Sequence, residues 1–304
     1  KYPMRFLKNL GITRRSISLF VLALMFQPNA AFAVDQLDGS VITWAGCGIT
    51  QKSFMKELAL GFEQKTGVKI DIEGGGATRG IRDTAQGKIM MGGSCRMTLP
   101  LTDSSESYVK LQPVAWDALA VILNRGNPVT NITSENIKKV YSGEITNWKQ
   151  LGGSDQPINL YVRQGTISGV GYAIRQYIFQ DSNFEFVTKK EFIKRSSGPI
   201  EKAVEKDPNA IAITGVSSAR KRDVNIISID GFVPTFENVK AGNYIFYRPL
   251  YLVSGPKSNH IVRDFITFAT SEKGKQILRD NDTVPYADAW HLMRKPLIYG
   301  NGVK

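Results

Sequence analysis

The sequence has 304 residues, with 39 Lys and Arg against 27 Asp and Glu, and a formal net charge of +12 at pH 7. Its basic residues are scattered, without interleaved aromatic residues, which excludes an extended nucleic-acid surface. No Walker motif, dinucleotide fingerprint or nucleophile elbow occurs, so the sequence predicts neither a nucleotide hydrolase nor a serine hydrolase. Two cysteines without a neighbouring His or third Cys do not predict a zinc site. We therefore expect no metal, no cofactor and no enzymatic activity.

Residues 1–33 have the pattern of an export signal. A basic segment containing Arg14-Arg15 precedes an apolar run from Ile17 to Phe26, and Ala31-Phe32-Ala33 is typical of a cleavage site. The run is too short to span a bilayer comfortably. We expect a mature chain of 271 residues beginning at Val34, exported to the periplasm by the general or the twin-arginine route. Its charge would be +7, because residues 1–33 hold five basic and no acidic residues.

Three short apolar strands follow, and each runs into a loop of small and polar residues. Helical patterns over 51–65 and up to Gln86 separate the strands. In an open parallel sheet, ligands bind at the carboxyl ends of the strands, where these loops would gather. The strands and loops are 41–45 with 46–50, 68–72 with 73–80, and 89–91 with 92–96.

A fourth loop of this kind, Arg163-Gln-Gly-Thr-Ile-Ser-Gly-Val-Gly171, joins a strand over 158–162 to a helical pattern over 169–179. Unpaired N–H groups at a helix start, hydroxyls and the guanidinium of Arg163 are donors suited to an oxyanion, although an ordinary N-cap at Ser168 explains the pattern equally well. The remaining patterns predict strands over 114–123, 210–214, 224–229 and 247–253, and helices over 134–140 and 261–278 with a break near Ser271.

We expect an element such as 248–254 to return to the first domain and complete it, which gives two lobes joined by two crossings with a cleft between them. Two long motifs then carry a resemblance. Tyr141-Ser-Gly-Glu-Ile-Thr-Asn-Trp-Lys-Gln-Leu-Gly-Gly153, and 229–244 followed by Arg248-Pro-Leu-Tyr-Leu-Val253, resemble the periplasmic phosphate-binding proteins of ABC transporters. The resemblance covers essentially the whole mature chain.

The resemblance implies an α/β, type II periplasmic binding fold, in which each lobe is a doubly wound sheet flanked by helices. Lobe 1 would comprise 34–120 and 246–304, and lobe 2 would comprise 121–245. The implied function is a monomeric receptor that captures phosphate or a related oxyanion in the interlobe cleft and delivers it to a membrane permease. The residues implied to bind the ligand are Ile49, Thr50, Thr78, Ser94, Arg96, Arg163, Ser168, Gly169 and Val170.

Two departures from the family pattern affect the choice of ligand. Phosphate receptors often carry an Asp in the third loop that accepts the proton of hydrogen phosphate, whereas this chain has Cys95 or Arg96 there. In the fourth loop the family reads Ser-Gly-Thr, and Val170 replaces the Thr hydroxyl. The oxyanion class survives these changes, but the identity of the anion does not follow.

The only two cysteines, Cys47 and Cys95, both fall in predicted ligand loops. If the first and third strands are neighbours, about 4.8 Å apart, a disulfide can join the two residues, and an oxidising envelope favours it. The alternatives are two buried free thiols or a functional thiol site, since thiolates are soft donors. The last alternative predicts a different function, an envelope sensor of arsenite or another thiophilic ligand that signals to a membrane kinase.

Overall fold

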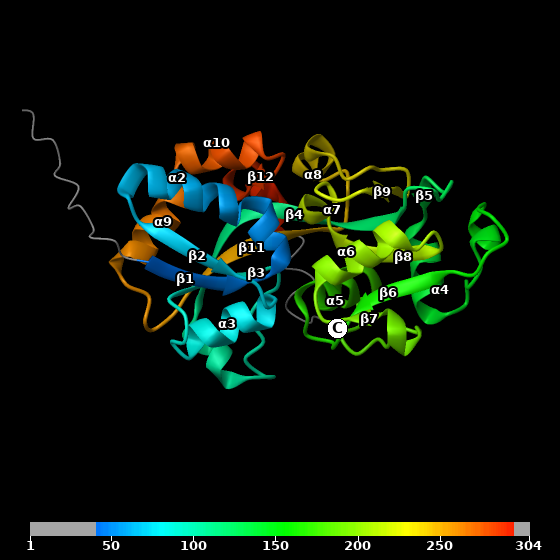
Figure 1. The fold of residues 1–304 in the computed structure, drawn as a ribbon, viewed down its shortest axis with the longest axis horizontal. Helices are drawn as coiled ribbons and strands as arrows, with labels where there is room; N and C mark the ends of the chain where they lie inside the picture. The colour runs from blue at the N-terminus through cyan, green and yellow to red at the C-terminus, as the bar shows by residue number, and fades with distance from the viewer. Residues whose placement is uncertain (1–40, 295–304) are drawn as a thin grey trace, which may run out of the picture. The chain divides into compact units, whose positions relative to one another are not determined.

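The computed structural model describes residues 41–294, so the predicted export signal and the start at Val34 lie outside the described residues. The described residues all belong to one compact unit. Within the described part, a ten-stranded mixed sheet has the order β2-β1-β3-β11-β4-β8-β6-β7, with β9 and β12 added along β4. Helices pack against this sheet along its length (Figure 1). The chain is therefore α/β, as the sequence predicts.

One half of the sheet is built by the N-terminal strands. β1 (Val41–Gly46) lies parallel to both β2 (Lys69–Glu73) and β3 (Met91–Ser94), so the three predicted strands are neighbours and the first lies beside the third. The helix predicted over 51–65 begins earlier, at Gly48, and runs through α1 (Gly48–Thr50), a π-helical segment (Gln51–Met55) and α2 (Lys56–Thr66). Gly67 ends it in the left-handed conformation with φ 76°.

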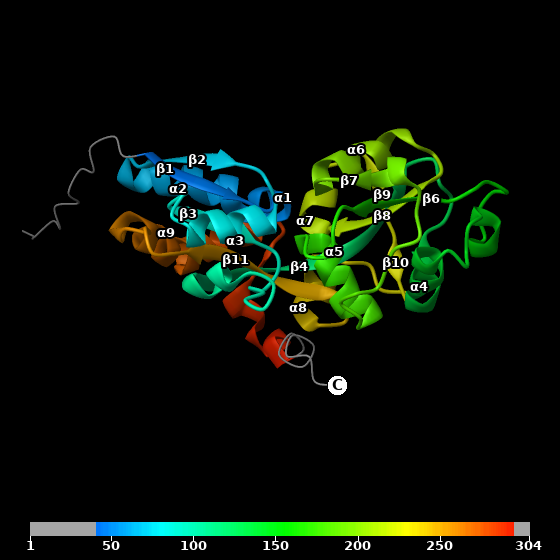
Figure 2. The ribbon, with the colours of Figure 1, turned by 90° about the horizontal axis from the view of Figure 1, so that it is seen from below.

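The other half of the sheet is built by the middle of the chain. β6 (Asn159–Arg163) lies parallel to β7 (Ile193–Lys194) and to β8 (Ala210–Gly215), and α6 (Ser197–Lys206) packs on β6 and β8. The sequence did not predict α6 or β7. Figure 2 shows α5, α6 and α7 gathered around these strands.

Two strands connect the halves. β4 (Lys110–Asn124) pairs with β11 (Tyr247–Ser254) over its first part and with β8 over the five residues from Leu119 to Leu123. β11 returns antiparallel and inserts between β3 and β4, so the element expected over 248–254 pairs with a strand of the N-terminal half. The ends of β1, β3 and β6 are thereby brought toward one region.

The other predicted elements lie close to their expected places, except that the strand predicted over 224–229 is divided into two, and several short elements were not predicted. The helix predicted over 261–278 is two helices separated at Ser271, whose hydroxyl accepts a hydrogen bond from the Gly274 N–H and so caps the second. The remaining helices are α3 (Ala77–Ala85), α4 (Ser134–Ser142), α5 (Gly169–Ile174), α7 (Val216–Ala219), α8 (Phe236–Ala241), α9 (His260–Thr270) and α10 (Glu272–Asp280). The remaining strands are β5 (Asn131–Ile132), β9 (Val224–Ile226), β10 (Ser228–Ile229) and β12 (Val284–Pro285).

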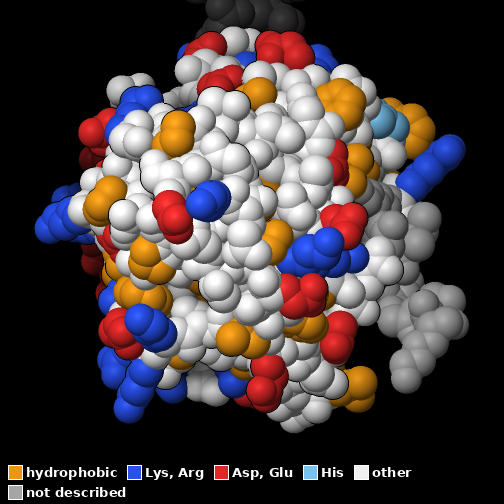
Figure 3. Space-filling view, turned by 90° about the vertical axis from the view of Figure 1, so that its right-hand side faces the viewer, with side chains coloured by type: hydrophobic (Ala, Val, Ile, Leu, Met, Phe, Trp, Pro, Cys, Tyr) orange, Lys and Arg blue, Asp and Glu red, His pale blue; other side chains and the backbone are white. Residues whose placement is uncertain are grey.

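The surface and the core show the expected division of side chains. Apolar residues of the sheet strands and the inner helix faces form a large core that includes Trp44, Phe54 and Trp116. On the face seen in Figure 3, acidic and basic side chains are interspersed and apolar ones are scattered, as expected of a solvated surface. Across residues 41–294, no helix has the length and apolar character needed to cross a membrane.

Candidate functional site

Four loops meet where the strands end. We call them loop 1 (46–50), loop 2 (74–78), loop 3 (94–96) and loop 4 (163–170). Loop 1 contacts its neighbours through the backbone, because Cys47 N donates to Gly93 O at 3.0 Å and Gly76 N donates to Gly46 O at 2.9 Å. A β-carbon added at Gly169 would lie 2.3 Å from Cys95 Sγ, so loop 4 lies directly against loop 3. The structure thus brings together all four predicted ligand loops.

The helices that start in three of these loops have no side-chain caps. The N-cap residues of α1, α3 and α5 are Cys47, Gly76 and Ser168, and none accepts a hydrogen bond from the first turn through its side chain. Outside these loops, α4, α8, α9 and α10 each have such a cap, whereas α6 and α7 do not. Backbone N–H groups at an uncapped helix start are donors for an anion. Their gathering here favours an anion site.

The predicted hydroxyl donors mostly donate to backbone carbonyls of the protein. Thr50 Oγ1 donates to Cys47 O at 2.7 Å, and Ser94 Oγ donates to Arg96 O at 2.8 Å. Thr78 Oγ1 donates to Ile167 O at 3.3 Å, and Ser168 Oγ donates to Gly165 O at 3.4 Å. The latter two bonds are long and therefore weak. Ile49, Gly169 and Val170 are buried beside these hydroxyls.

Arg96 is committed to the protein itself, in contrast to its predicted role as a ligand-binding side chain. Its guanidinium makes two hydrogen bonds to Glu106, at 2.8 and 2.9 Å, and both side chains are fully buried. The other three N–H groups donate to Met97 O, Ile167 O and Thr78 Oγ1. A guanidinium has five N–H donors, and all five are used here. The structure therefore leaves no Arg96 donor for a ligand.

The pairing with Arg96 also lowers the pKa of the Glu106 carboxylate. Burial alone would raise the pKa of Glu106, but hydrogen bonds from Arg96 and the Leu99 N–H lower it below its ordinary value. Because Arg96 contacts loop 2 at Thr78 and loop 4 at Ile167, this ion pair fixes loop 3 against both. Sequence reasoning missed Glu106, which lies in the polar run Ser104-Ser-Glu-Ser107 with no sign that it would be buried.

The side chain of Arg163, in contrast to that of Arg96, has no partner among the described residues. This side chain forms no hydrogen bond or ion pair with any residue in 41–294, and its Nε is buried without a partner. Its guanidinium reaches loop 2, since Nη2 would lie 3.7 Å from a β-carbon at Gly76. Burial lowers the pKa of Arg163, with the thiols of Cys47 and Cys95 opposing that shift. A partly desolvated cation without a counter-charge favours an anion beside it.

A second arginine in this region, Arg248 on β11, already has a negatively charged partner in the protein. It is 1% exposed and lies 3.4 Å from the carboxylate of Asp117, and it donates to the carbonyl oxygens of Cys95 and Gly169. It therefore links loops 3 and 4 to β4, where Asp117 lies. In the sequence, Arg248 and Asp117 are each a charged residue within an otherwise apolar predicted strand, which is the feature that could have pointed to them. The sequence analysis assigned neither residue to the site.

The two cysteines are adjacent, buried and not joined by a disulfide. The two side chains influence each other's ionisation, since each is among the causes of the other's pKa shift. Burial raises the pKa of Cys95 well above its ordinary value; it also acts to raise that of Cys47, but the influence of Cys95 and the charge of Arg248 lower the pKa of Cys47 to about 7. The predicted proximity is therefore observed. No group of three or more His, Cys, Asp or Glu side chains within the described residues could hold a metal ion.

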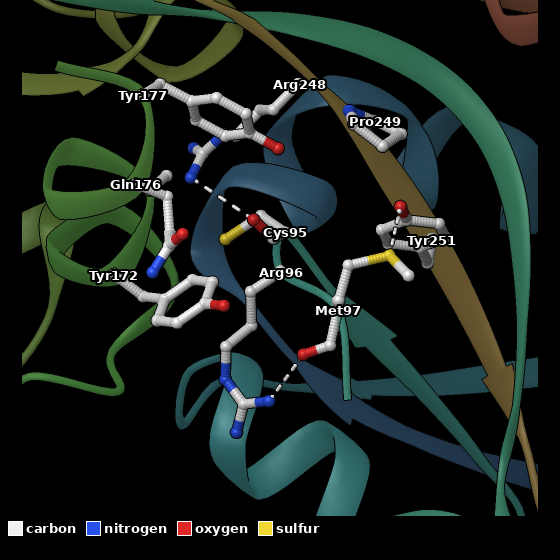
Figure 4. Close-up of a pocket in the computed structure, with 10 residues that line it drawn as sticks. Cys95, Arg96, Met97, Tyr172, Gln176, Tyr177, Arg248, Pro249 and Tyr251 are labelled. Atoms are coloured by element: carbon white, nitrogen blue, oxygen red, sulfur yellow. Dashed lines mark hydrogen bonds between the residues drawn. The ribbon is translucent and has the colours of Figure 1, made fainter. Parts of the chain in front are cut away.

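Cys95 also borders a narrow crevice between loop 3, α5 and β11. Figure 4 shows Tyr172, Gln176 and Tyr177 on one side of it, facing Arg96 and Met97. Tyr251 OH donates to Met97 Sδ at 3.0 Å on the far wall. Its volume of about 20 Å³ has room for roughly one water molecule. The crevice is thus a seam between packed elements and is too small to bind a larger ligand.

Comparisons with known proteins agree with this geometry. A family profile described as a PBP superfamily domain matches residues 38–273. A Borreliella burgdorferi protein named phosphate-binding protein PstS is 27% identical over 271 residues, which cover 86% of this chain and 96% of that protein. A Bacillus subtilis protein of the same name is 25% identical over 262 residues, covering 86% of this chain and 85% of its own length.

Among solved structures, the chain is likewise similar to proteins of phosphate transport. A Clostridium perfringens ABC transporter substrate-binding protein with bound phosphate is similar with a TM-score of 0.71 and 28% identity, over 81% of this chain and 99% of that one. A Vibrio cholerae ABC-type phosphate transport receptor has a TM-score of 0.60 and 26% identity, over 81% and 100% of the two chains. The predicted two-lobed binding fold and the resemblance to phosphate-binding proteins are confirmed. So is the prediction of a binding protein rather than an enzyme.

Proposed function

Because the chain belongs to the PBP superfamily, we propose that it is a periplasmic receptor that captures phosphate or a related tetrahedral oxyanion between two lobes. The names of its relatives support phosphate as the first anion to test. Two solved relatives are named as an ABC transporter protein and a transport receptor, which supports delivery to a membrane permease. We propose that the receptor acts as a monomer.

One observation carries this proposal. Arg163 is the charged side chain of the four loops that lacks a counter-charge among residues 41–294, whereas Arg96 is paired with Glu106. An oxyanion beside Arg163 would supply that charge, and its remaining oxygens would accept from the uncapped N–H groups of α1, α3 and α5.

The proposed lobes are 34–120 with 246–304, and 121–245. We propose that the closed form of these lobes holds loop 4 against loops 2 and 3, as the contacts of Ile167 and Gly169 do in this structure. Within them, we propose that the ligand contacts Ile49, Thr50, Thr78, Ser94, Arg163, Ser168, Gly169 and Val170. We assign Arg96 to positioning the loops, because all its donors are used.

Titration calorimetry of the mature protein with phosphate, sulfate, arsenate and arsenite tests the proposal. We expect phosphate to bind and Arg163→Ala to weaken binding by at least about 2 kcal/mol, because a charge-assisted hydrogen bond is lost in a desolvated site. Arg125→Ala is the matched control, since Arg125 is exposed and paired with Asp223 far along the sheet. Equal affinities of the two variants would show that loop 4 does not hold the anion.

We further propose that Cys47 and Cys95 form a disulfide in the oxidising periplasm, since they follow the neighbouring strands β1 and β3, where Gly46 lies opposite Gly93. Intact mass after alkylation of the exported protein, with and without reductant, would detect the loss of two hydrogens. We expect Cys95→Ser to prevent this loss and to leave phosphate affinity within about threefold of wild type. Free thiols in the exported protein would refute the disulfide.

The arsenite-sensor alternative is not favoured, because the relatives compared are named for phosphate. Calorimetry distinguishes the two functions: arsenite binding that requires reductant and both thiols would support sensing. Export is tested separately by sequencing the N-terminus of the periplasmic protein, for which we expect Val34.

A further inference from the structure

A groove of about 540 Å³ adjoins loop 4 on the side formed by β6 and β7. Its walls include Arg163, Arg175, Glu185, Phe186, Lys190 and Arg195. The volume is within the range of roughly 300–1,000 Å³ that small-molecule sites occupy. β6 and β7 are parallel and end at Arg163 and Lys194, so the groove lies at the carboxyl ends of two strands, where open α/β sheets bind their ligands.

The charges of this groove are strongly unbalanced. Four of the named side chains are cationic and one, Glu185, is anionic, which leaves a surplus of three positive charges. No ion pair within residues 41–294 involves Arg163, Lys190 or Arg195, although many other basic side chains of the protein are paired. One phosphate ion at Arg163 would neutralise only part of this surplus.

Arg175 is held in place as a fixed part of the groove wall. It is 5% exposed, donates from Nε to Phe184 O at 2.7 Å and from Nη1 to Gly171 O at 3.1 Å, and stacks over the ring of Phe186 at 3.7 Å. Its partners are carbonyl oxygens and an aromatic ring, so its positive charge is oriented but not neutralised. The guanidinium of Arg175 is buried and held in one orientation, whereas the side chains of Lys190 and Arg195 are exposed and can adjust their positions. The groove therefore combines one fixed cation with two that can move toward a ligand.

We propose that this groove extends the anion site, so that the receptor binds condensed phosphates, whose terminal phosphoryl group lies at Arg163 and whose other groups lie along Arg175, Lys190 and Arg195. The inference rests on the proposed function, because Arg163 is shared by both. An anion with several phosphoryl groups matches the charge surplus and the size of the groove. A single tetrahedral anion matches neither.

Titration calorimetry with orthophosphate, pyrophosphate and tripolyphosphate at one fixed ionic strength tests this inference. The variant Lys190→Ala/Arg195→Ala removes two groove charges. Lys202→Ala/Lys206→Ala is the control, because it removes the same charge from exposed positions of α6 that are unpaired within the described chain. We expect the groove variant to bind tripolyphosphate at least tenfold more weakly and orthophosphate within threefold of wild type, and the control to change neither by more than twofold.

Two results would overturn the extended site: absence of tripolyphosphate binding to the wild type, or equal weakening in both double variants, which would indicate general charge attraction. Competition adds a further check, since orthophosphate in excess must displace tripolyphosphate if both use Arg163. Simultaneous binding of the two would also overturn the inference. The proposed function is judged separately, by whether orthophosphate alone binds to the wild type.

Discussion

Replacing Glu106 with Gln tests whether Arg96 is a structural side chain. The variant keeps the size of the side chain but leaves the buried Arg96 guanidinium without its negative partner, and it places an amide N–H₂ where Glu106 accepted from Arg96, Arg82 and the Leu99 N–H. Breaking a buried ion pair by neutralising one partner costs about 3–5 kcal/mol. For a domain of this size, each kcal/mol lowers Tm by about 2–4 °C. We therefore expect Tm to fall by about 6–20 °C.

Urea unfolding monitored by circular dichroism would measure the loss, with Glu272→Gln as the control. Glu272 makes ion pairs with Lys275 and Arg279 on the surface, with 69% of its side chain exposed, so the same substitution there should cost no more than about 1 kcal/mol. Equal losses in the two variants would refute the reasoning and would return Arg96 to the list of ligand-binding candidates.

The same pair predicts how stability depends on pH. The pKa of Glu106 is lower in the folded protein than the value of about 4.3 expected when it is unfolded. Its contribution is therefore fully present above about pH 4.3 and is lost as the pH falls through the folded pKa. Because Gln does not titrate, the variant should lose stability less steeply than the wild type in this acid range.

Two glycine substitutions extend these tests to the loops. Gly169→Ala would place a β-carbon 2.3 Å from Cys95 Sγ, so we expect phosphate affinity to fall at least tenfold in calorimetry while the circular dichroism spectrum is unchanged. Gly93→Ala would place one 2.1 Å from Trp44 Cζ2 in the core, and urea unfolding should show a loss of about 1–3 kcal/mol. Wild-type behaviour of either variant would mean that the contact relaxes without cost.

The sequence predicted the features of the site that depend on local patterns. Apolar runs ending in Gly-rich loops located the ends of β1, β2 and β6 to within one residue, whereas β3 continues to Ser94, through residues predicted as loop. The neighbouring positions of the first and third strands, which the sequence analysis took as a condition, are observed. The charge pairing was not predictable in this way, because the pairs Arg96–Glu106 and Arg248–Asp117 join residues on different elements. Which arginine remains free for an anion is decided by these non-local pairs. The sequence alone therefore treated Arg96 and Arg163 alike.

The hydrogen bonds of the loops indicate where binding energy must come from in this receptor. The hydroxyls of Thr50 and Ser94 donate to carbonyl groups at short distance, and Cys47, Cys95 and Val170 bring no hydroxyl at all. The donors that remain are the weakly bonded hydroxyls of Thr78 and Ser168, the backbone N–H groups at three helix starts and the guanidinium of Arg163. None of these groups is negatively charged, and the four loops contain no Asp or Glu to accept the proton of an anion. A site of this composition binds an anion through its negative charge and has no group that recognises a proton on the anion. It therefore has little means of rejecting sulfate when phosphate is present.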